Sequence, residues 1–221
     1  SDVCSSDLGV RIAAMKDWEV GPRDTELFER ELEHFVPPVL FDAHAHWYCV
    51  DHIPAAVAPR LAASGPPVAG AKAYDEAIER LIPRRRTEGL FFPLPHAQVD
   101  VDAANAFLHR ELLDRPRSRG QMLITPTMDP EFIRETVRRC GFVGLKCYHL
   151  FSPRRPTFDS FIEEYLPEPQ VRVAHEEGLS ITLHMVRARA LADPANRVLL
   201  AHRDGALIGT VTITDAVASW P

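Results

Sequence analysis

Two histidines separated by one alanine, His44 and His46, follow a short apolar run. The run, Val39 to Phe41, comes after two prolines and is typical of a buried parallel strand. Because side chains alternate along a strand, both histidines and Asp42 are predicted to point to the same side. Two neutral imidazoles placed in this way could bind one divalent metal ion, or they could lie on a hydrated loop or cap a turn.

A lysine within an apolar stretch, Lys146, is a second candidate for chemistry. An ammonium group is costly to bury, so it commonly has a carboxylate partner or a shifted pKa. Lys146 could bind a substrate carboxylate, or its stem could lie along the core while its amine reaches solvent. Its neighbour Cys147, on the opposite face of the strand, is expected to fill space rather than to act as a nucleophile.

Other polar side chains follow later apolar runs. His96, Tyr148, His149 and His184 each lie at or just beyond the end of such a run. In parallel α/β proteins the chemistry lies at the carboxyl ends of the strands, so these residues are expected to share a pocket with the first two histidines. His184 could instead be a structural histidine, and the other three could cap or line loops.

Three of these segments, in this order, resemble the amidohydrolase superfamily. They are Asp42 to His46 after the first strand, Gly141 to Lys146 on a later strand, and Ser180 to His184 on the next. The resemblance covers roughly Phe35 to Asn196, and it is greatest to the amidohydrolase-related branch that includes aminocarboxymuconate-semialdehyde decarboxylase-like enzymes. It implies a divalent metal ion, Zn2+ first and Mn2+ or Fe2+ as alternatives, bound by His44, His46 and His184.

The function that this resemblance implies is a metal-dependent hydrolase, acting on a small carboxylate-bearing organic substrate through metal-activated water. A non-oxidative metal-dependent decarboxylase and a non-catalytic fragment are the alternatives. In some relatives a lysine at the position of Lys146 is carboxylated and bridges two metal ions, whereas other branches use one ion, and the sequence does not choose. Lys146 is therefore expected to be catalytic or to bind substrate, and His96, Tyr148 and His149 are candidate substrate-binding residues.

Helical patterns alternate with short apolar runs along the chain. Helices are expected at 25–35, 71–81, 100–113, 129–139 and 158–177, and strands at 39–41, 89–95, 121–125, 142–146 and 179–183. This alternation favours a parallel α/β sheet. With the resemblance it predicts a (β/α)8 TIM-like barrel of the metal-dependent hydrolase type, incomplete at its C-terminal end. The Pro-rich connection from Tyr48 to Pro83 is expected to form a lid or a pocket wall.

The end of the chain departs from the family pattern, in which a sixth strand ends in a histidine and an eighth strand supplies an aspartate. Val198 to His202 imitates the sixth strand, but only about 17 residues separate His184 from His202, which is short for a strand-helix-strand unit. His202 is kept as a candidate substrate-binding residue and Asp215 as a candidate for the missing catalytic acid. The tail is expected to be cut short or frameshifted.

Three segments are expected along the chain: residues 1–8, an N-terminal helical extension at 9–36, and a partial barrel domain at 37–221. Residues 2–8, DVCSSDL, resemble the translation of a common sequencing-adapter oligonucleotide, and no initiator methionine precedes them. Residues 1–8 are therefore expected to be non-native and are excluded from the fold prediction.

The composition is ordinary for a globular domain, with 46% hydrophobic and 25% charged residues in 221. The net charge of -6 argues against nucleic acid or an anionic membrane as the main partner, although Arg84 to Arg86 and Arg138 to Arg139 could bind anions locally. No apolar run approaches the ~20 residues of a membrane helix, and no signal peptide is visible. We therefore expect a cytoplasmic protein with a small-molecule substrate, whose full-length parent could be a homo-oligomer.

Four cysteines lie far apart, and none forms a C-x-x-C pair. The sequence therefore suggests neither a zinc ribbon nor a disulfide framework.

Overall fold

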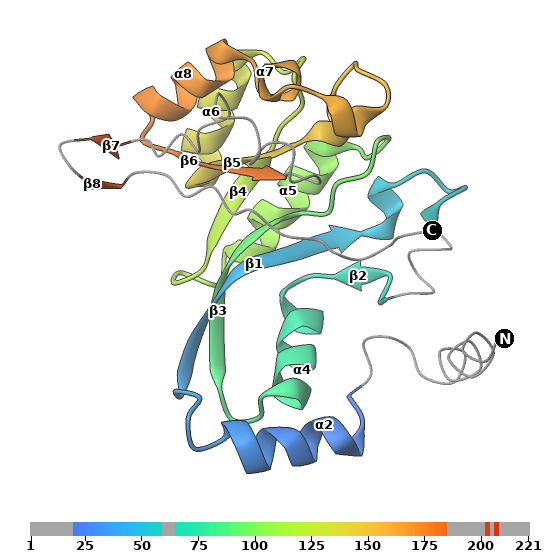
Figure 1. Ribbon diagram of the computed structural model, residues 1–221, viewed down its shortest axis with the longest axis vertical. Helices are drawn as coiled ribbons and strands as arrows, with labels where there is room; N and C mark the ends of the chain where they lie inside the picture. The colour runs from blue at the N-terminus through green and yellow to red at the C-terminus, as the bar shows by residue number, and fades with distance from the viewer. Residues whose placement is uncertain (1–19, 59–64, 185–201, 204–205, 208–221) are drawn as a thin grey trace, which may run out of the picture. The chain divides into compact units, whose positions relative to one another are not determined.

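The structure is a computed structural model that describes residues 20–58, 65–184, 202–203 and 206–207 (Figure 1). The chain divides into two compact units, one formed by 1–94 and 98–118 and the other by 95–97 and 119–221. Each unit has its own strands and helices.

The described part of the first unit contains three α-helices and a parallel strand pair with an aromatic core. Its elements in chain order are α2 (Pro22–Leu27), the π-helix η1 (Phe28–Leu32), β1 (Val39–Cys49), the short 3-10 helix η2 (Val50–His52), β2 (Val68–Ala69), α4 (Ala71–Leu81), β3 (Arg86–Pro93) and α5 (Val101–Leu112). β1 runs parallel to β3, while β2 pairs antiparallel with the end of β1 through Tyr48 and Cys49.

An aromatic cluster connects this strand pair to helix α4. The rings of Trp47 on β1 and Phe91 on β3 stack with their centroids 3.8 Å apart, and neither side chain is more than 1% exposed. Tyr74 of α4 meets Phe91 edge-on, with centroids 5.0 Å apart. Offset and edge-on aromatic pairs of this kind add specific geometry to the burial of apolar area, so they fix where α4 lies against the two strands.

The second unit contains three parallel strands in the order β4, β5, β6. Its elements are β4 (Arg119–Leu123), α6 (Pro130–Cys140), β5 (Gly144–Tyr148), η3 (His149–Phe151), η4 (Thr157–Asp159), α7 (Ile162–Tyr165), α8 (Glu168–Glu176) and β6 (Ser180–His184). β7 (His202–Arg203) and β8 (Ala206–Leu207) pair with each other as a short antiparallel hairpin.

Helix α6 shows how local sequence sets the boundaries of an element. The side chain of Asp129 accepts hydrogen bonds from two amides of the first turn, and Pro130 occupies the first helical position, where no amide hydrogen is needed. Gly141 ends the helix with a φ of 67°, a left-handed conformation that favours glycine. The predicted helix at 129–139 is confirmed.

The predicted (β/α)8 barrel is wrong. In the described parts of the chain the principal strands form one group of three in each unit, and β2 runs antiparallel to its neighbour, whereas the barrel requires eight parallel strands. The prediction failed because strand-helix alternation is shared by every parallel α/β sheet, and the alternation alone does not specify closure.

Element boundaries also differ from the prediction, most clearly in β1 and after Phe158. β1 extends to Cys49, so His44 and His46 lie within a strand rather than after it. The helix expected at 158–177 is instead η4, α7 and α8, because Pro167 lacks an amide hydrogen and stands at the N-cap of α8.

Among the described residues, no helix has the length and apolar character needed to cross a bilayer.

Candidate functional site

His44 and His46 lie side by side on β1 in the first unit. Their ring centroids are 5.3 Å apart, and each ring meets Phe92 edge-on, at 4.5 Å from His44 and 4.8 Å from His46. Both histidines are half-buried. The structure therefore brings the two imidazoles together, as the His-x-His spacing predicted.

A hydrogen bond to the backbone fixes the orientation of His46. Its Nδ1 lies 3.1 Å from the carbonyl oxygen of Pro93 on β3. Because a carbonyl oxygen can only accept, Nδ1 donates, and in the neutral ring Nε2 then carries the lone pair. Metal-binding histidines commonly have one ring nitrogen bonded to a backbone carbonyl or carboxylate in this way, so the chemistry of this pair fits two ligands of a divalent ion.

Asp42 holds the backbone that precedes these histidines. Its Oδ1 accepts from the backbone amide of His44 at 2.9 Å, and its Oδ2 accepts from the hydroxyl of Tyr74 at 3.1 Å. A bulge shifts the register between Asp42, which pairs with Gly89, and Ala45, which pairs with Phe91. The regular alternation that predicted a common side for Asp42 and the histidines is therefore interrupted.

Lys146 lies on β5 in the second unit, and its side chain is 1% exposed. The interpretation in which its amine reaches solvent is therefore wrong. Its Nζ lies 5.0 Å from the centre of the Tyr148 ring, and burial lowers the pKa of Lys146 to about 8. The neighbouring Cys147 is buried, and burial raises the pKa of its thiol, which keeps it protonated and agrees with a packing role.

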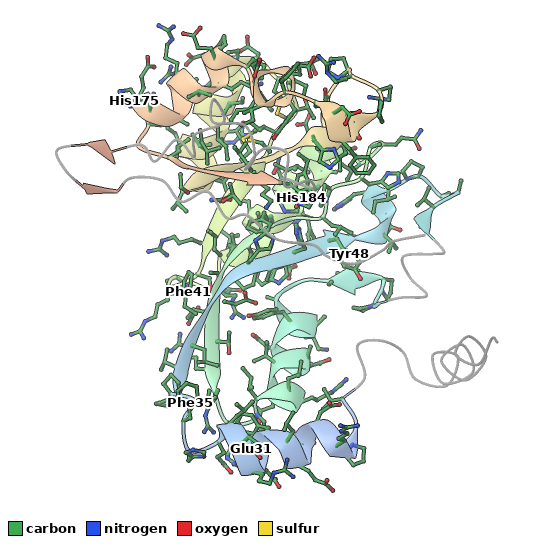
Figure 2. All side chains as sticks on the ribbon, viewed as in Figure 1. Glu31, Phe35, Phe41, Tyr48, His175 and His184 are labelled. Atoms are coloured by element: carbon green, nitrogen blue, oxygen red, sulfur yellow. The ribbon has the colours of Figure 1, made fainter. Side chains whose placement is uncertain are left out.

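Four rings follow one another beyond Lys146 at the ends of β5 and β6. Tyr148 and His184 are 4.7 Å apart between centroids, His184 and His149 are 5.6 Å apart, and His149 and Phe158 are 5.2 Å apart. His184 ends β6 (Figure 2). The second unit therefore brings together Lys146 and three of the residues that the sequence placed at strand ends.

His149 is the most buried histidine of this group, at 9% exposed. Within the described part of the chain its buried Nδ1 has no hydrogen-bond partner. Burial lowers its pKa, and a hydrogen bond with the backbone of Thr157 opposes that shift. A buried ring nitrogen can donate or accept one hydrogen bond, so it is suited to bind a polar atom of a ligand.

The predicted three-histidine ligand set takes His44 and His46 from the first unit and His184 from the second, and it stays a prediction. No group of three or more His, Cys, Asp or Glu within the described ranges could hold a metal ion. His96 is half-buried and follows β3. His202 belongs to β7, but its side chain lies outside the described residues, as does the whole of Asp215.

Arginines from both clusters that the sequence suggested as local anion sites are bonded within the protein. Arg85 donates to the carbonyl of Glu33 at 2.7 Å, and Arg86 forms an ion pair with Glu88 at 2.7 Å. Arg138 forms one with Glu177 at 2.7 Å. These guanidinium groups therefore stabilise the fold, and their contacts do not support an anion site.

A cavity of about 650 Å³ in the first unit lies between α4, β3 and α5. Arg85 and Arg86 of the suggested anion cluster line it, but none of the predicted metal-binding, catalytic or substrate-binding residues does. Its walls carry Arg115, which forms an ion pair with Asp75 at 2.6 Å and donates to the carbonyl of Thr87 at 2.6 Å. Arg115 therefore links helix α4 to strand β3 in the wall of the cavity.

Three residues that contact the histidine segment were not expected from the sequence: Tyr74, Phe92 and Pro93. Each lies far from its partner along the chain, so no local motif points to it, although the predicted helix at 71–81 and the predicted strand at 89–95 contain them. No protein-family model matches the chain, and comparisons with curated proteins and with solved structures give no match.

Proposed function

We propose that this chain acts as a metal-dependent hydrolase of the amidohydrolase-related kind, on a small organic molecule that carries a carboxylate. The observation that carries the proposal is the pair His44 and His46, with Nδ1 of His46 bonded to the carbonyl of Pro93. That bond leaves Nε2 as the atom with the lone pair, which is the arrangement that metal-binding histidines use.

His44 and His46 would be two ligands of the ion in the first unit, and His184 is the proposed third. A bound divalent ion such as Zn2+ supplies Lewis-acid chemistry, which activates water and polarises a substrate carbonyl. The protein's own part is to hold the imidazoles. The hydrogen bond between His46 and Pro93 orients the His46 ring. The hydrogen bond that Asp42 accepts from the His44 amide holds the backbone of His44.

The second unit supplies a cation and a ring stack suited to an organic anion. With a pKa of about 8, Lys146 is mostly protonated at neutral pH, and a buried ammonium attracts a carboxylate more strongly than an exposed one. The Nδ1 of His149 can donate to or accept from a second polar atom of the substrate. A small-molecule substrate and a cytoplasmic location belong to the same proposal.

Metal content of the purified chain tests the proposal. After refolding with Zn2+, Mn2+ or Fe2+, the wild type should retain one of these ions stoichiometrically. His44→Ala, His46→Ala and His184→Ala should each lose it. His175→Ala is the matched control, because His175 is an exposed histidine of helix α8 (Figure 2). A wild type that retains no metal would contradict the function.

Product analysis separates hydrolysis from decarboxylation. Incubation with a panel of carboxylate-bearing amides and esters in water labelled with heavy oxygen should place that oxygen in an organic product. Release of carbon dioxide, with a proton from water taking its place and no heavy oxygen in the organic product, would instead identify the decarboxylase. Bound carbon dioxide on Lys146, detected by mass spectrometry of the intact chain, would show that this lysine bridges metal ions rather than binding substrate as a cation.

A further inference from the structure

The carboxylate of Asp42 links the histidine segment of β1 to helix α4. Its Oδ1 accepts from the backbone amide of His44 at 2.9 Å, and its Oδ2 accepts from the hydroxyl of Tyr74 at 3.1 Å. Hydrogen bonds to a charged acceptor are stronger than those between neutral groups. A carboxylate bound through both oxygens therefore ties the backbone at His44 to the position of Tyr74.

The backbone at this point is irregular and needs a local support. β1 advances three residues from Asp42 to Ala45 while β3 advances two, from Gly89 to Phe91. Bulges of this kind bend a strand and re-aim the side chains beside them. A hydrogen bond that an aspartate side chain accepts from the amide two residues later is a common way to fix such an irregular backbone.

Tyr74 is itself held in the aromatic core of the first unit. Its ring lies 5.0 Å from Phe91 and 6.1 Å from Trp47 between centroids, and the guanidinium of Arg115 lies 5.8 Å from it. Burial and the neighbouring Asp42 raise the pKa of the phenol, so the hydroxyl remains a donor at neutral pH. The anchor for Asp42 is thus a donor whose place is set by closely packed rings.

We propose that Tyr74 is a positioning residue for the metal site. Through Asp42 it sets the backbone at His44, and with it the placement of that imidazole beside His46. The inference rests on the proposed function, in which these two histidines bind the ion.

Two substitutions change the hydrogen bond between Tyr74 and Asp42 from its two sides. Tyr74→Phe removes the hydroxyl and keeps the ring. Asp42→Asn keeps an oxygen that can accept from the His44 amide, but it removes the negative charge, and its side-chain nitrogen can only donate, so the Tyr74 hydroxyl no longer donates to a charged acceptor. Tyr165→Phe is the control, because Tyr165 is a tyrosine of the second unit that is 3% exposed. Co2+ affinity, from its absorption spectrum, and hydrogen exchange at the His44 amide are measured in all three and in the wild type.

Tyr74→Phe and Asp42→Asn should weaken Co2+ binding about tenfold, the lower end of what groups behind metal ligands contribute. Both should also speed exchange at the His44 amide, and Tyr165→Phe should do neither. Unchanged affinity and unchanged exchange in Tyr74→Phe would overturn the proposal, and so would an equal loss in Tyr165→Phe. A wild type that binds no Co2+ would contradict the proposed function, while exchange at His44 would still decide whether Tyr74 holds this backbone.

Discussion

The ammonium nitrogen of Lys146 lies 5.0 Å from the centre of the Tyr148 ring, on a strand whose five residues are all buried. The face of an aromatic ring attracts a cation, but it replaces only part of the hydration that a buried ammonium loses. The fold therefore retains a charged group that costs stability, as binding and catalytic sites often do.

Replacing this lysine should stabilise the fold at neutral pH. The pKa of Lys146 is lowered from 10.5 to about 8, so the folded state binds the proton less tightly than the unfolded state. The free-energy cost of burying the charged amine is present in full below about pH 8. It disappears as the pH rises toward 10.5, the pKa of the unfolded state. Lys146→Met should therefore raise the free energy of unfolding by up to about 3 kcal/mol near neutral pH.

Urea unfolding across this pH range measures the effect. Wild-type stability should rise relative to Lys146→Met between about pH 8 and about pH 10.5. Lys72→Met is the matched control, because the side chain of Lys72 is 91% exposed and should show no such trend. A constant difference between the wild type and Lys146→Met over the whole range would contradict the burial cost.

A β-carbon at Gly89, which pairs with Asp42, should disturb the bulge that contains His44. It would lie 2.8 Å from Cζ of Phe91 and 2.9 Å from the carbonyl oxygen of Asp42, both closer than real side chains come. Gly89→Ala should destabilise the first unit by about 1–3 kcal/mol, as overpacking commonly does, and should weaken metal binding as well.

Gly141→Ala provides the comparison for that variant. A β-carbon at Gly141 meets nothing within 4 Å, but the φ of 67° is unfavourable for alanine. Gly141→Ala should lower the free energy of unfolding by about 1 kcal/mol. It should leave metal binding unchanged. Thermal unfolding together with metal content distinguishes the two glycines, and equal metal loss in both variants would show that binding follows stability alone.

The carboxylate of Glu177 should contribute stability that disappears in acid. Hydrogen bonds and charge from Arg138 and Arg134 lower its pKa, so the folded state binds this proton less tightly than the unfolded state. The contribution is present above the unfolded value of 4.5 and is lost as the pH falls through the folded pKa. Glu177→Gln should lower the urea midpoint at neutral pH, and the difference should vanish in acid.

A second glutamate controls for general loss of charge in the Glu177→Gln experiment. Glu168 pairs with Arg172 one turn away on α8, and its side chain is 80% exposed. Exposed pairs of this kind contribute little, so Glu168→Gln should change the midpoint far less. Equal effects of the two substitutions would contradict a specific link between α6 and α8 through Glu177.

Part of the candidate site could be predicted because it depends on residues that are close together in the sequence or at the ends of apolar runs. The spacing of His44 and His46 placed both rings together, since residues two apart on a strand share a side. The ends of apolar runs likewise placed Tyr148 and His184 close together, because β5 and β6 are parallel and pair through these residues. What could not be predicted was the bulge after Asp42, because register depends on the partner strand.

The sequence by itself determined the helix at α6 through Asp129, Pro130 and Gly141, whose effects act within a turn or two of the backbone. It also determined the strand-helix alternation and the pairing of the two histidines. Only the tertiary structure decided that the strands form no eight-stranded parallel barrel in the described residues and that Tyr74 reaches Asp42. The reason is that these outcomes depend on contacts between residues tens of positions apart, which periodicity and caps do not encode.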